Sequence, residues 1–202
     1  MLFSILKRKQ FMDQRKKATE TIALHKQILS QLENKGLETT LAAAQLLTDC
    51  LQGGGCIYLC GNGGSAADAQ HIAAELVGRF VRERKGLAAV ALTVDTSILT
   101  SVGNDYGFEQ VFARQVEALM RPGDVLWAFS TSGTSKNILA AAQKTKSIGA
   151  KILAFTGKPA SPLEAMADVC LCLEGPTATV QEIHQVAYHI ICDLVEEAST
   201  NT

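Results

Sequence analysis

The sequence predicts an α/β fold, in which helices cover both faces of a parallel β-sheet. Short apolar runs alternate with segments of helical composition along most of the chain. The runs are continuously apolar, as expected for strands buried on both faces. Two of them end in turns rich in glycine or serine that lead into helices. With 202 residues, 47% of them hydrophobic, the chain can form one domain with a helical extension.

Composition and charge exclude several classes of protein. The formal net charge is -1, which argues against nucleic acid as a partner. No apolar stretch is long enough to cross a bilayer, and Met1 to Ile5 is too short for a signal peptide. The six cysteines form no C-x-x-C pair and mostly lie in apolar runs. We therefore expect reduced thiols in a cytoplasmic protein that neither enters nor spans a membrane.

The N-terminal part is predicted to be helical. Residues 11–32 have apolar side chains at helical spacing, Lys35-Gly36 is expected to break the helix, and residues 37–51 form a second helix. Two helices before the first strand do not fit a simple alternating unit. We expect residues 1–52 to be a helical extension that packs on the core or on another subunit, and residues 53–202 to be the α/β domain.

The α/β domain is predicted to contain five strands, at residues 56–60, 88–94, 125–129, 151–156 and 169–173. Helices are expected at residues 65–80, 96–102, 108–120, 136–148 and 179–197, with a short helical turn at 163–167. Residues 103–107 are expected to be a loop. Ligands on such sheets bind beyond the carboxyl ends of the strands, at the switch in strand order.

Two polar turns are expected at this ligand edge. Gly61 to Ser65 contains three glycines, and Ser130 to Ser135 contains five hydroxyl residues. Hydroxyls and free N–H groups at a helix start suit a phosphate monoester; the alternative is an ordinary helix cap, for which one hydroxyl is enough. The first turn formally matches G-x-G-x-x-A, but the expected acidic residue is missing at its usual distance, so a sugar phosphate fits better than a dinucleotide.

Acid–base candidates lie on two helices. His71 and Glu75 are four residues apart and share one face, and the last helix carries Gln181 and His189 on one broad side. Each histidine alone could be a packing residue. Together the four side chains could form a divalent-metal site or an acid–base pair, provided that the two helices meet.

Four motifs, in order and at suitable spacing, resemble those of bacterial phosphoheptose isomerases of the sugar isomerase (SIS) family. They are CGNGGSAADAQHIAAEL at 60–76, SVGNDYGF at 101–108, STSGTS at 130–135 and QEIH at 181–184. The resemblance extends over about residues 20 to 197. It implies an SIS-type three-layer sandwich with a five-stranded parallel sheet. It also implies a homotetramer with active sites between subunits.

The resemblance implies an aldose–ketose isomerase that converts D-sedoheptulose 7-phosphate to D-glycero-D-manno-heptose 7-phosphate through an enediol, for lipopolysaccharide or other surface glycans. The family's catalytic pair corresponds to Glu75 and His189. Its zinc ligands correspond to His71, Glu75, Gln181 and His189. Its substrate contacts correspond to Asn62, Gly63, Gly64, Glu75, Asn104, Asp105, Ser130, Thr131, Ser132, Ser135 and Gln181.

Two features of this assignment stay open. If Glu75 and His189 both bind metal, neither is a free base at that moment, so metal binding and proton transfer compete or the metal shifts. Thr179-Val180 precedes Gln181 where many relatives have Arg-Ile, which leaves one polar contact near the sugar unassigned.

Two alternatives remain beside the heptose isomerase. One relative of similar sequence is a non-catalytic scaffold that binds the replication initiator DnaA and lacks the catalytic Glu and His, whereas this chain has both Glu75 and His189. The other alternative is an isomerase of a different sugar phosphate, such as a pentose phosphate. A turnover assay distinguishes the heptose isomerase from the non-catalytic scaffold, and a substrate panel distinguishes it from an isomerase of another sugar phosphate.

Overall fold

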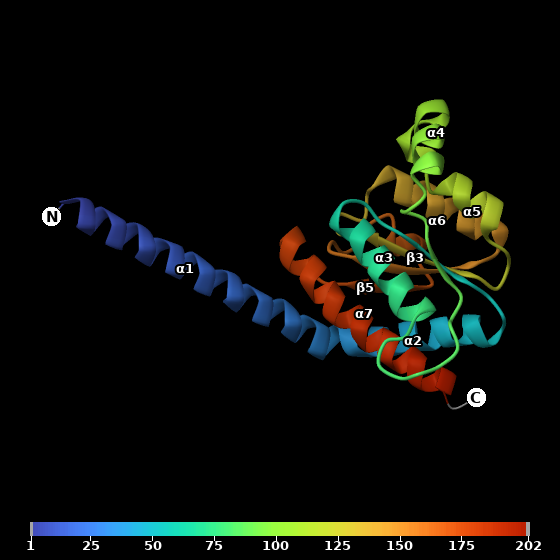
Figure 1. Ribbon diagram of the computed structural model, residues 1–202, viewed down its shortest axis with the longest axis horizontal. Coiled ribbons are helices and arrows are strands. Elements are labelled where there is room, and N and C mark those ends of the chain that lie inside the picture. Colours follow the sequence, from blue (N-terminus) through green and yellow to red (C-terminus); the bar gives the residue numbers. More distant parts are fainter. Residues whose placement is uncertain (1, 201–202) are drawn as a thin grey trace.

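The computed structural model describes the backbone of residues 2–200 and the side chains of residues 11–200. Within these residues the chain forms three layers, with a five-stranded parallel sheet between two layers of helices (Figure 1). The strands are β1 Ile57–Cys60, β2 Ala89–Ala91, β3 Val125–Ser130, β4 Lys151–Thr156 and β5 Val169–Cys172. The predicted fold class is therefore confirmed.

The strand order β2-β1-β3-β4-β5 places the switch point between β1 and β3. These two strands pair in parallel, with Cys60 opposite Ala128. The chain leaves β1 toward one edge of the sheet to form β2, and then returns to the other side of β1 to form β3. The turns that follow β1 and β3 consequently flank the crevice in which ligands bind on sheets of this kind.

Alternate residues of the central strands enter two separate cores. Trp127 and Phe129 join Phe155 in the core beneath α2, α3 and α7, whereas Leu126 and Ala128 join the core beneath α5 and α6. The five helices are α2 Leu37–Gln52, α3 Gly64–Val77, α5 Ala113–Leu119, α6 Lys136–Ile148 and α7 Thr177–Thr200. Both faces of the central strands β1, β3 and β4 are buried, which explains why the interior positions of these strands are apolar.

The N-terminal helices differ from the prediction, because no break occurs at Lys35-Gly36. Helix α1 Leu2–Gln31 continues through a π-helical turn, Leu32–Gly36, directly into α2. Gly36 has helical backbone angles, and a Cβ there would lie 3.0 Å from Leu171 Cδ1. The glycine thus permits close packing on β5 instead of ending the helix. The first part of α1 extends away from the domain (Figure 1).

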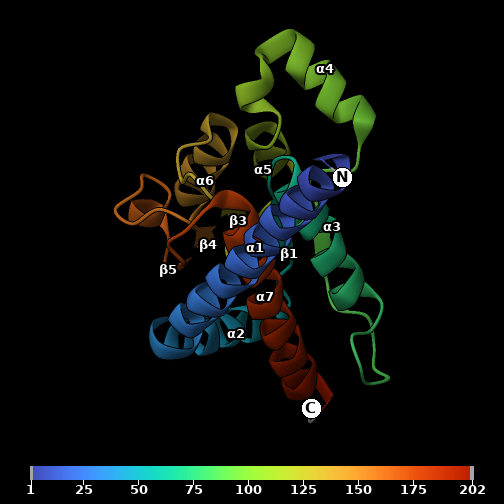
Figure 2. The same ribbon diagram turned by 90° about the vertical axis from the view of Figure 1, so that its left-hand side faces the viewer.

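Helix α4 is longer than predicted. It spans Thr96–Tyr106 and includes most of the expected loop at 103–107. Asp95 caps its start by accepting a hydrogen bond from the Ile98 N–H, and Gly107, with φ 88°, ends it. One internal glycine costs about 1 kcal/mol in a helix, too little to stop it at Gly103. None of the residues of α4 is buried, and the helix stands out from the domain (Figure 2).

Short 3-10 helices span Phe108–Gln110 and Glu164–Met166. All six cysteines lie in the described part of the chain and are free, as predicted. Burial raises the pKa of Cys60 and of Cys192 to about 12, so these thiols stay protonated near neutral pH. None of the helices in the described residues is long and apolar enough to cross a membrane.

Candidate active site

The glycine-rich turn after β1 allows α7 to approach the start of α3. Gly63 has φ 56°, a conformation that favours glycine. A Cβ at Gly64 would lie 2.2 Å from the side-chain Nε2 of Gln181. The amide of Gln181 therefore packs directly over Gly64, and a larger residue there would displace that amide.

The hydroxyl-rich turn after β3 bonds mainly to itself. Ser130 Oγ donates to Ser135 Oγ at 3.0 Å, and Ser132 Oγ accepts from the Thr134 N–H at 3.2 Å. Ser135 occupies the N-cap position of α6, but its side chain makes no capping hydrogen bond. The hydroxyls are thus not used as the ordinary helix cap that was the alternative interpretation, and the exposed Ser132 can reach a ligand.

A pair of amides joins the two turns. Asn62 and Asn137 exchange two hydrogen bonds, from Asn62 Nδ2 at 2.9 Å and from Asn137 Nδ2 at 2.8 Å. Asn137 is buried on the first turn of α6. The pair fixes the two turns relative to each other across the switch point.

The imidazole and carboxylate candidates meet between α3 and α7. His71 Nε2 lies 3.0 Å from Glu75 Oε1, and the rings of His71 and His189 are 5.1 Å apart between centroids. One ligand atom from each of His71, Glu75 and His189 lies within 4.8 Å of the others. The condition that the two helices meet is therefore satisfied within one chain.

Neighbouring side chains orient these rings. The Tyr188 hydroxyl lies 3.0 Å from His71 Nδ1, which leaves Nε2 as the nitrogen that faces Glu75. Burial, followed by the nearby carboxylate of Asp68, raises the pKa of Tyr188, so its hydroxyl stays protonated. Burial and the neighbouring His71 lower the pKa of His189, which favours a neutral imidazole near neutral pH.

Other predicted site residues lie apart from this cluster. Gln181 is eight residues before His189, about two turns of α7, and lies at the glycine turn. Asn104 and Asp105 are exposed near the end of α4, where Asn104 Nδ2 donates to Asp105 Oδ1 at 2.8 Å. The described contacts do not bring these three residues to the His71, Glu75 and His189 cluster.

Three residues that shape the site are not among the predicted site residues: Phe80, Asn137 and Tyr188. The ring of Phe80 stacks on His189, with centroids 5.5 Å apart and planes at 24°. Tyr188 precedes a candidate histidine, and Asn137 follows the hydroxyl turn. Nearness in the sequence to a candidate residue or motif was the only indication of a role for these residues. Nearness in the sequence does not predict contact between side chains.

Comparison with known proteins identifies the family of the chain. Residues 22–157 match the SIS domain family. The phosphoheptose isomerase of Helicobacter hepaticus is 52% identical over 155 residues, which are 76% of this chain and 79% of that protein. The chain belongs to the phosphoheptose isomerase family.

Solved structures of phosphoheptose isomerases share the whole fold. The enzyme from Neisseria gonorrhoeae superposes with a TM-score of 0.86 at 43% identity, covering 91% of this chain and 98% of that one. The enzyme from Francisella tularensis gives 0.88 at 35% identity, with the same coverage. The family resemblance inferred from the four motifs is therefore confirmed over nearly the full length.

Proposed function

We propose that this chain is an aldose–ketose isomerase that interconverts D-sedoheptulose 7-phosphate and D-glycero-D-manno-heptose 7-phosphate. The observation that carries the proposal is the meeting of His71, Glu75 and His189 within 4.8 Å in a chain that belongs to the phosphoheptose isomerase family. In the forward direction one proton leaves C1 of the ketose and O2 gains a proton, which gives the enediol. O1 then loses its proton and C2 gains one, which gives the aldose without any external oxidant.

Glu75 and His189 are the proposed acid–base pair. Glu75 is half-buried, and His189 is kept neutral by burial and by His71. A carboxylate can take the carbon-bound proton, and a neutral imidazole can exchange protons with the sugar oxygens near neutral pH. The hydroxyl turn, with Ser130, Thr131, Ser132 and Ser135, is proposed to hold the phosphate, assisted by the N-terminal N–H groups of α6.

The proposed metal ligands within one chain are His71, Glu75 and His189. Two imidazoles and one carboxylate are a donor set that suits zinc, and with their ligand atoms within 4.8 Å of one another, small side-chain movements would bring them around one ion. When bound, zinc supplies Lewis-acid polarisation of the sugar carbonyl. Gln181, the fourth ligand implied by the family, stays a prediction, as do the substrate contacts of Asn62, Gly63, Gly64, Asn104, Asp105 and Gln181.

We also propose a homotetramer in the cytoplasm. Apolar side chains of α1, the π-helical turn, α2 and α7 line an open groove, which includes Leu29, Leu32, Leu37, Val186 and Ile190. Such a surface suits a second copy of this chain, and light scattering tests the assembly by its mass. The six free thiols suit a reducing compartment, where the product would enter heptose biosynthesis for surface glycans.

An NMR product assay with sedoheptulose 7-phosphate tests the activity. We expect the aldose signal to appear with the wild-type protein and not with Glu75→Gln, and a chelator reports whether turnover needs the metal. Absence of turnover after supplementation with zinc would contradict the proposal and favour the DnaA-binding scaffold. A faster reaction with a pentose phosphate in the same assay would change the substrate and keep the acid–base pair.

A further inference from the structure

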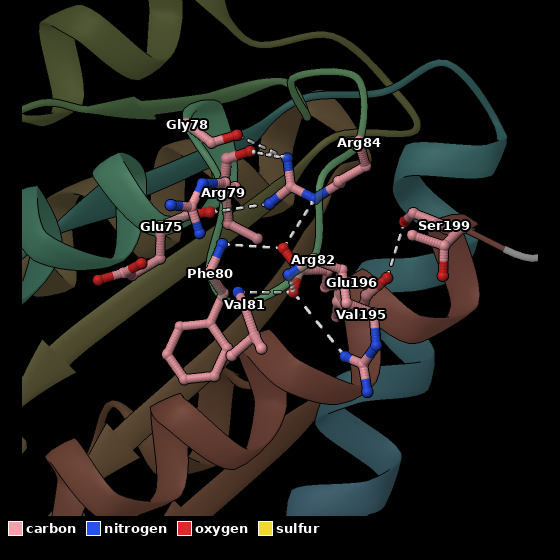
Figure 3. A network of polar contacts seen from close by, with 12 residues as sticks. Glu75, Gly78, Arg79, Phe80, Val81, Arg82, Arg84, Val195, Glu196 and Ser199 are labelled. Atoms are coloured by element: carbon pink, nitrogen blue, oxygen red, sulfur yellow. Dashed lines mark hydrogen bonds and ion pairs between the residues drawn. The ribbon is translucent and has the colours of Figure 1, made fainter.

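The segment between α3 and β2, residues 78–88, has no helix or strand, yet one buried carboxylate fixes its first part. Glu196 on α7 is fully buried. It accepts three backbone hydrogen bonds, from the N–H groups of Phe80 at 2.8 Å, Val81 at 2.8 Å and Arg82 at 2.7 Å (Figure 3). Burial raises the pKa of this carboxyl, but these donors and the nearby Arg84 outweigh it and hold the pKa below its ordinary value.

Arg84 connects the same carboxylate to the end of α3. Its Nε lies 3.3 Å from Glu196 Oε1, and its side chain is only 3% exposed. Its Nη2 donates to the carbonyl of Glu75 at 2.8 Å, and its Nη1 donates to the carbonyl of Leu76 at 2.8 Å (Figure 3). The last carbonyls of a helix lack partners within the helix, so a cation there both satisfies them and complements the helix dipole.

The Glu196–Arg84 pair therefore joins the three elements that form the site. These are α3 with Glu75, the segment with Phe80, and α7 with His189. In the segment held by this pair, the Phe80 ring stacks on the His189 imidazole, with centroids 5.5 Å apart. Tyr188 and His71 meet His189 edge-on, at 4.7 and 5.1 Å between centroids. The rings of Phe80, Tyr188 and His71 thus all pack against the imidazole.

We infer that Phe80 is a positioning residue for His189, and that Glu196 with Arg84 holds Phe80 against the imidazole. Phe80 has no group that can transfer a proton, so its contribution is the orientation of the ring that does. The inference rests on the proposed function, because His189 matters to turnover only if it belongs to the acid–base pair.

Substitutions at Phe80 test this inference in the full-length enzyme. Phe80→Ala removes the stacked ring, and Phe80→Tyr keeps it. Val77→Ala is the matched control, since it truncates an apolar side chain that is 53% exposed on the last turn of α3. An aromatic contact of this kind corresponds to about a tenfold change in rate, so we expect kcat of Phe80→Ala to fall about tenfold with little change in KM. Phe80→Tyr and Val77→Ala should retain turnover.

The NMR signals of the His189 ring give a readout that does not depend on turnover or on metal. In the metal-stripped protein, Phe80→Ala should shift these signals more than those of any other histidine, and Phe80→Tyr should largely restore them. Glu196→Gln should also shift them; if that variant fails to fold, the Phe80 variants decide. Unchanged His189 signals and kcat in Phe80→Ala, or equal losses in Phe80→Tyr, would overturn the inference. If the wild type lacks turnover but the ring signals respond, the proposed function fails and the positioning contact stands.

Discussion

The two ends of the proposed site are built in different ways. The hydroxyl turn is one contiguous stretch, and its internal bonds join residues two to five positions apart, such as Ser130 and Ser135. The imidazole–carboxylate cluster joins α3 to α7, and the bond between His71 and Tyr188 spans 117 residues. One end is therefore encoded locally, whereas the other depends on the packing of two helices.

The difference suggests a division of labour that substitutions can test. A turn that bonds to itself can lose one hydroxyl and keep its shape, so its residues should affect mainly how tightly the phosphate is held. In the proposed acid–base pair, Glu75 and His189 each contribute a single group. Substitutions in the cluster should therefore lower kcat, and substitutions in the turn should raise KM.

The largest expected effect is that of Glu75→Gln. The amide keeps the size of the side chain but cannot accept the carbon-bound proton. Removal of a general base costs about 10²- to 10⁴-fold in rate, and we expect a loss of this order in kcat with KM changed only a few-fold. Steady-state kinetics measures both, with circular dichroism as the control for folding. A kcat near that of the wild type would remove Glu75 from the acid–base pair.

A second test concerns His184, the buried histidine of α7. His184 is 1% exposed, and its Nε2 lies 3.2 Å from the Thr156 carbonyl at the end of β4. Burial lowers the pKa of His184 to about 4 from 6.5, so the unfolded chain binds more protons between these values. The neutral, buried imidazole of His184 therefore stabilises the folded state fully above pH 6.5, and this stabilisation is lost as the pH falls toward 4.

From this shift, the wild type should lose about 2 kcal/mol of unfolding free energy through His184 between pH 7 and pH 5. His184→Gln can keep a donor for Thr156 but does not titrate, so its stability should depend less steeply on pH. Urea unfolding of both proteins at the two pH values and one protein concentration measures the difference. Parallel pH profiles would show that His184 does not carry this dependence.

The smallest effect on kcat is expected in the hydroxyl turn. Ser132→Ala removes an exposed hydroxyl that is proposed to reach the phosphate. A hydrogen bond to a charged group contributes about 1.5 to 3 kcal/mol, so KM should rise about tenfold or more while kcat changes little. Ser147→Ala, at an exposed position near the other end of α6, is the control. A loss confined to kcat would contradict the division between the two ends of the site.

Local patterns in the sequence predict the layers, the alternation of strands and helices, and the two polar turns. Apolar runs and turn residues act over a few positions, so the predicted bounds of α6, Lys136–Ile148, and β4, Lys151–Thr156, agree with the structure. Helical spacing and the family resemblance also identified His71, Glu75 and His189 as candidate site residues.

Which candidates meet depends on tertiary packing. Gly36 and Gly103 do not end their helices, although glycine within a short stretch of sequence predicts a helix end. Gly36 packs closely on β5, and the cost of one glycine at position 103 is too small to end α4. Phe80 reaches His189 because a buried carboxylate more than a hundred positions along the chain holds its backbone. Contacts of this kind depend on how α3 and α7 pack, and no pattern within a short window of sequence contains that information.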